Sequence, residues 1–151
     1  MLKWIGYIAL GIGGVVLWGM ASGIGKYVGK TAVQEYQQGK VAGAIEEGLA
    51  NAAEQLRKQL PMKVDDITTW QSVISVGSLM SYNYTIDLRE SEIDHTTFIS
   101  KMGNNLKINV CGQKEMAETI RYGGRYMYTY MGVDGILIGS IEIGKKECGF
   151  D

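Results

Sequence analysis

The sequence predicts an α+β protein in which an N-terminal transmembrane helix and a linking helix precede a four-stranded antiparallel sheet packed against helices. An uncharged apolar run opens the chain, a stretch rich in Ala, Glu, Gln and Lys follows it, and strand-like and helix-like patterns then alternate. These observations divide the chain into an anchor over residues 1–30, an amphipathic linking helix over 31–60 and an extracytoplasmic domain over 61–151.

The N-terminal run extends from Trp4 to Gly25 without a charged residue, and Lys3 and Lys26 close it. As a helix it would be about 33 Å long, which is enough to cross a hydrocarbon core of about 30 Å. The alternative is a cleaved signal peptide, for which Gly19 and Ala21 are suitable small residues. The apolar run continues beyond them, which favours an uncleaved helix.

Small residues gather on one arc of this predicted helix, and the spacing of two of them matches GxxxG. Such an arc lets a second helix approach closely, although glycine is also common in membrane helices generally. The residues of the predicted helix contact are Gly6, Ala9, Gly13, Gly19 and Gly23.

The linking helix is predicted from an apolar seam with spacings of three and four residues, and Pro61 disfavours its continuation. The seam either docks on the chain's own domain or serves as a stalk, and a partner helix is the alternative. Its residues are Ala42, Ile45, Leu49, Ala52 and Leu56.

The domain is predicted to follow the order strand, strand, helix, helix, strand, strand, which suggests two hairpins separated by two helices. Asp134-Gly135 favours a tight turn in the second hairpin, with Leu137, Ile141 and Ile143 on one face. The predicted segments are Thr68 to Val76, Leu79 to Leu88, a helix starting at Ser91 with Asp94 three residues later, Lys114 to Arg121, Arg125 to Met131 and Ile136 to Ile143.

Five tyrosines occupy alternate strand positions and therefore share one face of each strand. They form either an exposed interaction surface or a half-buried row, since tyrosine favours both strands and such sites. These residues are Tyr82, Tyr84, Tyr126, Tyr128 and Tyr130.

Composition and motifs point away from catalysis. Three of the 15 basic residues and none of the 16 acidic residues lie in the first thirty positions, so the remainder carries a net charge of −4, which is unsuited to nucleic acid. His95 is the one histidine, and no motif surrounds it that would make a catalytic triad or a zinc site. We expect no enzymatic activity, cofactor, metal or small-molecule substrate.

Cys111 and Cys148 are the only cysteines, and they lack metal-ligand or CxxC spacing. They are either paired in a disulfide, which would require a compartment outside the cytoplasm, or two inert buried thiols. The lysines that follow the apolar run favour a cytoplasmic domain, but long domains are translocated despite flanking charge. We expect a single-pass inner-membrane protein with a periplasmic domain, the alternative being secretion to the periplasm after signal cleavage.

Residues 61–151 resemble an uncharacterised family of small exported or membrane-anchored bacterial α+β domains. The resemblance implies a periplasmic domain in which Cys111 and Cys148 are paired, and it supplies no catalytic residues. The residues that carry it, in order, are Pro61-x-x-Val64-Asp65, Thr68 or Thr69, Tyr82-x-Tyr84, Cys111, Gly124-x-Tyr126-x-Tyr128, Asp134-Gly135 and Cys148-Gly149-Phe150.

Two functions fit these features. The first is a membrane-anchored, non-catalytic interaction module, such as an accessory component of a bacterial envelope or secretion assembly, with the membrane and a protein partner or second copy as contacts. The second is a stand-alone envelope binding or inhibitory protein of the immunity type. The first predicts helix contacts through the glycine arc, whereas the second predicts that the domain alone suffices.

Overall fold

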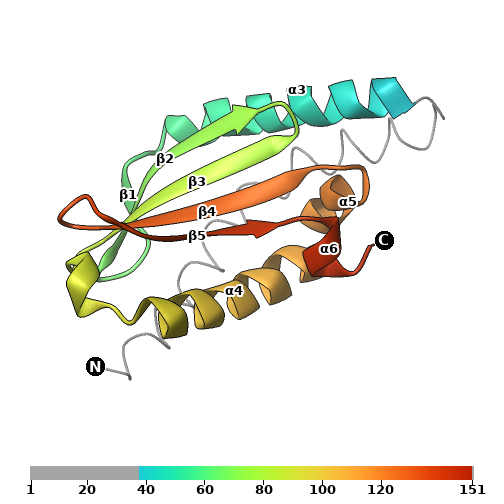
Figure 1. Ribbon diagram of the computed structural model, residues 1–151. Coiled ribbons are helices and arrows are strands. Elements are labelled where there is room, and N and C mark those ends of the chain that lie inside the picture. Colours follow the sequence, from blue (N-terminus) through green and yellow to red (C-terminus); the bar gives the residue numbers. More distant parts are fainter. Residues whose placement is uncertain (1–37, 151) are drawn as a thin grey trace.

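The computed structural model describes residues 38–150 and contains one sheet with helices along one of its faces (Figure 1). Within this range no helix is both long and apolar enough to cross a membrane. The predicted membrane helix and its small residues lie outside the described residues. The elements are α3 (Gln38–Arg57), β1 (Met62–Lys63), β2 (Thr68–Val76), β3 (Leu79–Ile86), the 3₁₀ helix η1 (Glu90–Glu92), α4 (His95–Gly112), α5 (Lys114–Arg121), β4 (Arg125–Gly132), β5 (Leu137–Ile143) and α6 (Lys145–Cys148).

The sheet has five strands in the order β1-β2-β3-β4-β5, and β3 and β4 run parallel while the other neighbours are antiparallel. The prediction of a four-stranded antiparallel sheet was therefore wrong in two respects. The two-residue strand β1 is too short to give a periodic signal. The connection through α4 and α5 returns the chain to the starting end of β3, and such a crossover joins parallel strands.

A register shift in the last hairpin corrects a second detail of the prediction. Between Tyr130 and Met131 the pairing of β4 with β5 slips, so that Met131 pairs with Leu137 and Tyr130 with Gly139. A bulge of this kind reverses the alternation beyond it. Ile138 is consequently buried with Ile141 and Ile143, while Leu137 is exposed, contrary to the predicted face.

The three longer helices, α3, α4 and α5, contribute one buried row each to a single core. On α3 the buried seam contains Ile45, Leu49, Ala53 and Leu56, so the predicted seam is nearly right in phase and docks against β2 and β3 of the same chain. In Figure 1, β2 passes in front of α3. The buried residues of α4 are Phe98, Met102, Leu106 and Val110, and those of α5 are Met116, Ala117, Thr119 and Ile120.

Local signals in the sequence explain where several elements begin and turn. The Asp94 carboxylate accepts a hydrogen bond from the Thr97 N–H at 3.3 Å, which caps the start of α4. The helix cap therefore lies three residues after the predicted start at Ser91, which lies in η1. Hydrogen bonds from Thr97 hold the pKa of the Asp94 carboxyl below its usual value. Gly135 has a φ of 76°, the left-handed conformation that the predicted Asp-Gly hairpin turn requires.

Candidate interaction surface

The five tyrosines of the predicted interaction surface are buried, with 0–2% of each residue exposed. The parallel register of β3 and β4 sets Tyr82 opposite Tyr128 and Tyr84 opposite Tyr130. The paired rings stack at centroid distances of 4.9 Å and 5.2 Å. An exposed surface made of these rings is therefore wrong. The sheet side of the core is a stacked aromatic row, completed by Trp70 against Tyr82 and Tyr84 and by the edge of Phe98 against Tyr130.

Burial also controls the acid–base behaviour of these rings. It raises the pKa of Tyr126 to about 12, although a hydrogen bond with Thr119 opposes the shift. The pKa values of Tyr82, Tyr84 and Tyr128 lie well above 10, first because of burial and then because of neighbouring tyrosines. These phenols are therefore unsuited to proton transfer near neutral pH.

The opposite side of the same strands forms the surface that we name the open face. Strand register places its residues in cross-strand rows, because alternate side chains point to opposite sides. In the described part of the chain, the helices lie against the tyrosine side and not against this one. The open face comprises Thr69, Ser72, Ile74 and Val76 of β2, Leu79, Ser81, Asn83 and Thr85 of β3, Arg125, Met127, Thr129 and Met131 of β4, and Leu137, Ser140 and Glu142 of β5.

A polar row crosses the middle of the open face. The Asn83 side-chain amide donates to Ser72 Oγ at 3.0 Å, and the hydroxyls of Thr129 and Ser140 lie 3.1 Å apart. Apolar side chains flank this row on both sides. Four of them are substantially exposed: Ile74 (47%), Val76 (70%), Met131 (38%) and Leu137 (51%).

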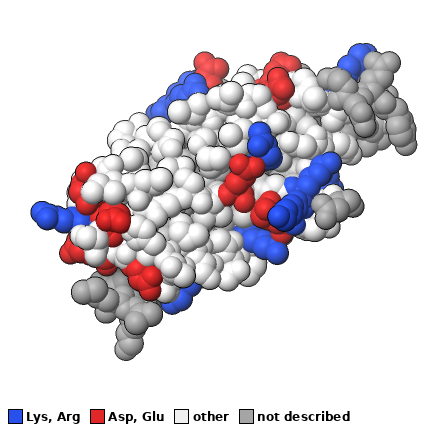
Figure 2. All heavy atoms as spheres, viewed as in Figure 1, with Lys and Arg blue, Asp and Glu red and all other residues white. Residues whose placement is uncertain are grey.

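Charge is nearly absent from the open face. Its two charged residues on β2 to β5, Arg125 and Glu142, pair with each other at 3.3 Å near one end, and Lys63 of β1 lies on the same side beside Thr69 at the sheet edge. Figure 2 shows a broad uncharged area in this view, with acidic and basic side chains gathered mainly toward its margins. The surface therefore suits a neutral macromolecular partner better than a charged one.

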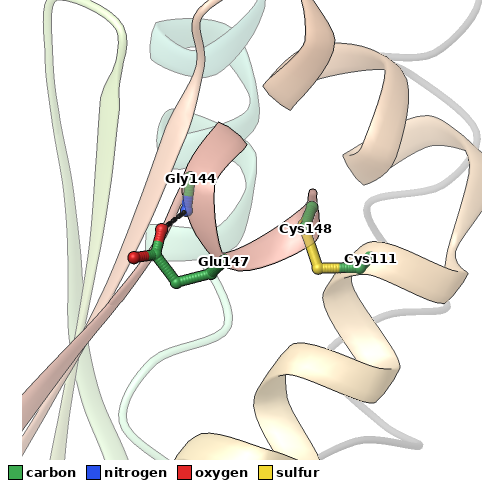
Figure 3. The surroundings of a disulfide bond; sticks show 4 residues. All are labelled: Cys111, Gly144, Glu147 and Cys148. Carbon is green, nitrogen blue, oxygen red and sulfur yellow. Dashed lines mark hydrogen bonds between the residues drawn. A yellow bond between two sulfur atoms is a disulfide. The ribbon is translucent and has the colours of Figure 1, made fainter. Parts of the chain in front are cut away.

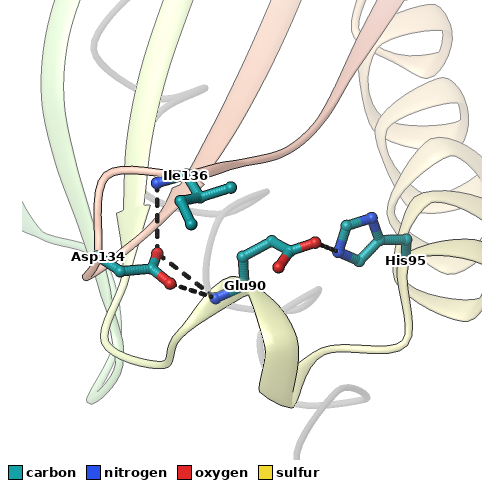
Figure 4. A network of polar contacts seen from close by, with 4 residues as sticks. All are labelled: Glu90, His95, Asp134 and Ile136. Atoms are coloured by element: carbon teal, nitrogen blue, oxygen red, sulfur yellow. Dashed lines mark hydrogen bonds and ion pairs between the residues drawn. The ribbon is translucent and has the colours of Figure 1, made fainter.

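The polar residues that most resemble catalytic groups hold two loops together. His95 Nε2 lies 2.7 Å from Glu90 Oε1. The Asp134 carboxylate accepts hydrogen bonds from the backbone N–H groups of Glu90 and Ile136 (Figure 4). The network joins the β4–β5 turn to η1 and the start of α4. The Glu90, His95 and Asp134 side chains are each engaged in these contacts.

Among residues 38–150 no cluster of three or more His, Cys, Asp or Glu side chains is arranged to hold a metal ion. Cys111 at the end of α4 and Cys148 in α6 form a disulfide with Cα atoms 5.4 Å apart (Figure 3). This is the pairing that the resemblance implied. Glu147 Oε2 accepts from the Gly144 N–H at 2.9 Å and so fixes the start of α6 beside the bridge.

Sequence reasoning missed the open face because it followed the aromatic positions of each strand. The signal was in the intervening residues, where Ser81, Asn83 and Thr85 of β3 and Met127 and Thr129 of β4 alternate with the tyrosines. The exposure of Ile74 and Val76 was harder to find, since a bulge between Trp70 and Ser72 shifts the alternation of β2.

The sequence matches no model of a known protein family, and no curated protein matches it significantly. Solved structures with this fold include two pilotins of type II secretion systems. The pilotin EpsS of Vibrio vulnificus aligns with a TM-score of 0.60 at 15% identity, covering 73% of this chain and 96% of its own. The pilotin AspS of Vibrio cholerae has a TM-score of 0.56 at 15% identity, covering 71% and 94%.

A third structure with this fold is a Pseudomonas aeruginosa protein described as a candidate secreted protein. Its TM-score is 0.62 at 11% identity, and the alignment covers 71% of this chain and 95% of that one. At these identities the similarity establishes a common α+β fold. The fold thus occurs in bacterial secretion-system proteins and extends over nearly their whole length.

Proposed function

We propose that this chain is a non-catalytic accessory component of a bacterial envelope secretion assembly, exported from the cytoplasm and tethered to the inner membrane by its N-terminal helix. The observation that carries the proposal is the fold, which two type II secretion pilotins share over 94% or more of their length. A binding role agrees with the polar groups described above, which are used in loop contacts.

In this proposal the chain binds its partner through the open face. The segment of the partner protein that covers this face is uncharged. Serine, threonine and asparagine in the middle row can exchange hydrogen bonds with such a segment, while the flanking apolar side chains lose exposed area. A lipid surface fits less well. On β2 to β5 the open face carries no lysine and its one arginine is paired with Glu142, while Lys63 of β1, beside Thr69, donates to the Asp66 backbone oxygen.

The proposed compartment agrees with the covalent bond between Cys111 and Cys148, because disulfides persist outside the cytoplasm. The proposed tether is the apolar run from Trp4 to Gly25, and Gly19 and Gly23 are its proposed helix-contact residues. Replacing both with isoleucine is expected to weaken association in a membrane dimerisation assay. Unchanged association would remove the glycine arc from the proposal.

The function is tested by affinity purification of the full chain from detergent-solubilised membranes. The test variant places lysine at Ile74 and Met131, and its control places lysine at Asn51 and Asn104, which are exposed on α3 and α4. We expect the wild type and the control to retain the same secretion-assembly protein and the open-face variant to lose it. Equal retention by all three would contradict the assignment of the open face.

A second arm separates the anchored component from a stand-alone binding protein. Residues 1–30 are deleted, and the domain is directed to the same compartment by a cleavable signal. Loss of the partner, or loss of secretion, is expected if the tether is needed. Full activity of the freed domain would favour the stand-alone alternative.

A further inference from the structure

Four buried polar atoms lie where the β1–β2 turn covers the end of the tyrosine row. They are Asp65 Oδ2, Thr68 Oγ1 and the hydroxyl oxygens of Tyr84 and Tyr130, and none has a hydrogen-bond partner among the described residues. Thr68, Tyr84 and Tyr130 are each at most 1% exposed. An unpaired polar group inside a protein is destabilising, so these atoms require an explanation.

The turn itself fixes the position of the carboxylate. Asp65 Oδ1 accepts hydrogen bonds from the N–H groups of Ile67 at 2.9 Å and Thr68 at 2.7 Å. One carboxylate oxygen is thus used to shape the turn beside Thr68. The second oxygen faces the interior, where a carboxylate needs hydrogen-bond donors.

The two tyrosines lie next to each other and beside this carboxylate. Their rings stack at 5.2 Å with planes 18° apart, and the two residues are register partners on the parallel strands β3 and β4. Burial and then the charge of Asp65 raise the pKa of Tyr130, and burial followed by Tyr130 raises that of Tyr84. Mutual influence of this kind requires proximity.

The other end of the tyrosine row behaves differently. There the Tyr126 hydroxyl forms a hydrogen bond with Thr119 of α5. Tyr126 thus has a direct protein partner, whereas Tyr84 and Tyr130 have none within the described chain. The difference locates the unsatisfied polarity at the β1–β2 end of the core.

We propose that Asp65 Oδ2, Thr68 Oγ1, Tyr84 OH and Tyr130 OH form a binding site for internal water, which links the β1–β2 turn to β3 and β4. Water fits this set because it donates to the carboxylate and also accepts from the hydroxyls. Internal waters typically make about three hydrogen bonds to groups that are otherwise unpaired. A bound metal cation fits less well, because the set offers one carboxylate and three neutral hydroxyls.

A high-resolution crystal structure of the full chain tests the site directly. We expect an ordered water within hydrogen-bond distance of Asp65 Oδ2 and of at least one tyrosine hydroxyl. A direct Asp65–Tyr130 hydrogen bond without water would overturn the proposal. So would an ion at this position, identified by the anomalous signal of rubidium after exchange.

Urea unfolding of Tyr130→Phe, Tyr84→Phe and Thr68→Val provides an independent test in solution. If water bridges these groups, each substitution removes one of its hydrogen bonds. The folding equilibrium constant should then fall about fivefold, the effect of losing one ordinary hydrogen bond. If the hydroxyls have no hydrogen-bond partner at all, phenylalanine removes the cost of burying them and the folding equilibrium constant rises. That result would overturn the proposed water site.

Tyr126→Phe calibrates the series, because it removes a direct hydrogen bond from the same row of rings. If Tyr130→Phe lowers the folding equilibrium constant about as much as Tyr126→Phe does, the result supports the water site. The crystal structure of the unaltered chain decides the matter if a variant does not fold.

Discussion

The two faces of the sheet are made from alternate residues of the same strands, yet they have opposite chemistry. One face of β3 and β4 has five buried tyrosines, stacked in register. The other has hydroxyl, amide and aliphatic side chains, several of them exposed. The contrast teaches that aromatic residues on these strands stabilise the fold, and that recognition is better sought in the residues between them.

The contrast is sharpest on β4, where neighbours in sequence belong to different environments. Tyr128 is 2% exposed and stacks on Tyr82, while Thr129 points to the open face and contacts Ser140. A substitution at one of these positions therefore tests the core, and a substitution at the next tests the surface.

High pH should produce the largest effect, because it acts on all five buried tyrosines together. Their folded-state pKa values exceed the unfolded value of about 10, so above that pH the unfolded chain binds fewer protons and stability falls. Below pH 10 this contribution is fully present. Five rings lower stability by up to about 7 kcal/mol per pH unit.

Phenolate absorbance and circular dichroism, measured together against pH, check this prediction. Most of the phenolate signal should appear with the loss of the folded spectrum, in one cooperative step. Ionisation of these five rings while the circular dichroism stays native would mean that the tyrosine face is open to water.

Tyr128→Ala and Thr129→Ala compare the two faces of the sheet at adjacent positions of β4. Removing the buried ring should cost about 3–5 kcal/mol in the free energy of unfolding, because it leaves a cavity in the aromatic row. Removing the threonine hydroxyl and methyl should cost less than about 1 kcal/mol. Urea unfolding measures both, and similar losses would show that the faces do not differ as described.

Loss of the disulfide should have a comparable effect on the helical side of the sheet. Cys111 and Cys148 are 37 positions apart, and opening a loop of this length costs roughly 4 kcal/mol in the chain-entropy model. Urea unfolding with and without reductant measures the difference. Alkylation in intact cells provides the control, and labelling of both cysteines without reductant would contradict both the bridge and the exported compartment.

Gly132→Ala should have a smaller effect, confined to the hairpin end of the sheet. An added Cβ would lie 2.5 Å from Asp134 Oδ1 and 2.8 Å from the Glu90 N atom, displacing the network that joins the hairpin to η1. We expect a loss of about 1–3 kcal/mol.

Gly43→Ala is the matched control for the hairpin glycine. Nothing lies within 4 Å of an added Cβ at this helical site, so the change should stabilise α3 by about 0.5–1 kcal/mol. If both alanines had the same effect, the close approach at Gly132 would not be what requires glycine there.

Local patterns predicted much of the fold. The period of two in β3, the Asp-Gly turn and the helix from Lys114 to Arg121 all appear in the structure, because each depends on neighbouring residues. The parallel pairing of β3 with β4 was not predictable in this way, since it depends on how two helices cross the sheet. The bulges were also missed, and each reverses the side of the sheet to which later residues point.

The site was predicted on the wrong face for a related reason. Strand periodicity groups residues by face but does not state which face the helices cover. The sequence allowed the tyrosines on the strands of Tyr82 and Tyr128 to be either an exposed surface or a half-buried row. Only tertiary contacts distinguish these two possibilities. The cysteines were easier, since the chain has one possible pair.

The most direct test of the open face as the partner-binding surface is photocrosslinking in living cells. A photoreactive amino acid is placed at Ile74 or Met131 on the open face, and at Asn51 or Asn104 on the helices. We predict that one secretion-assembly protein is captured from both open-face positions and from neither helix position. Capture of that protein from the helix positions alone, or capture of lipid or a second copy of this chain at Ile74 and Met131, would contradict the account.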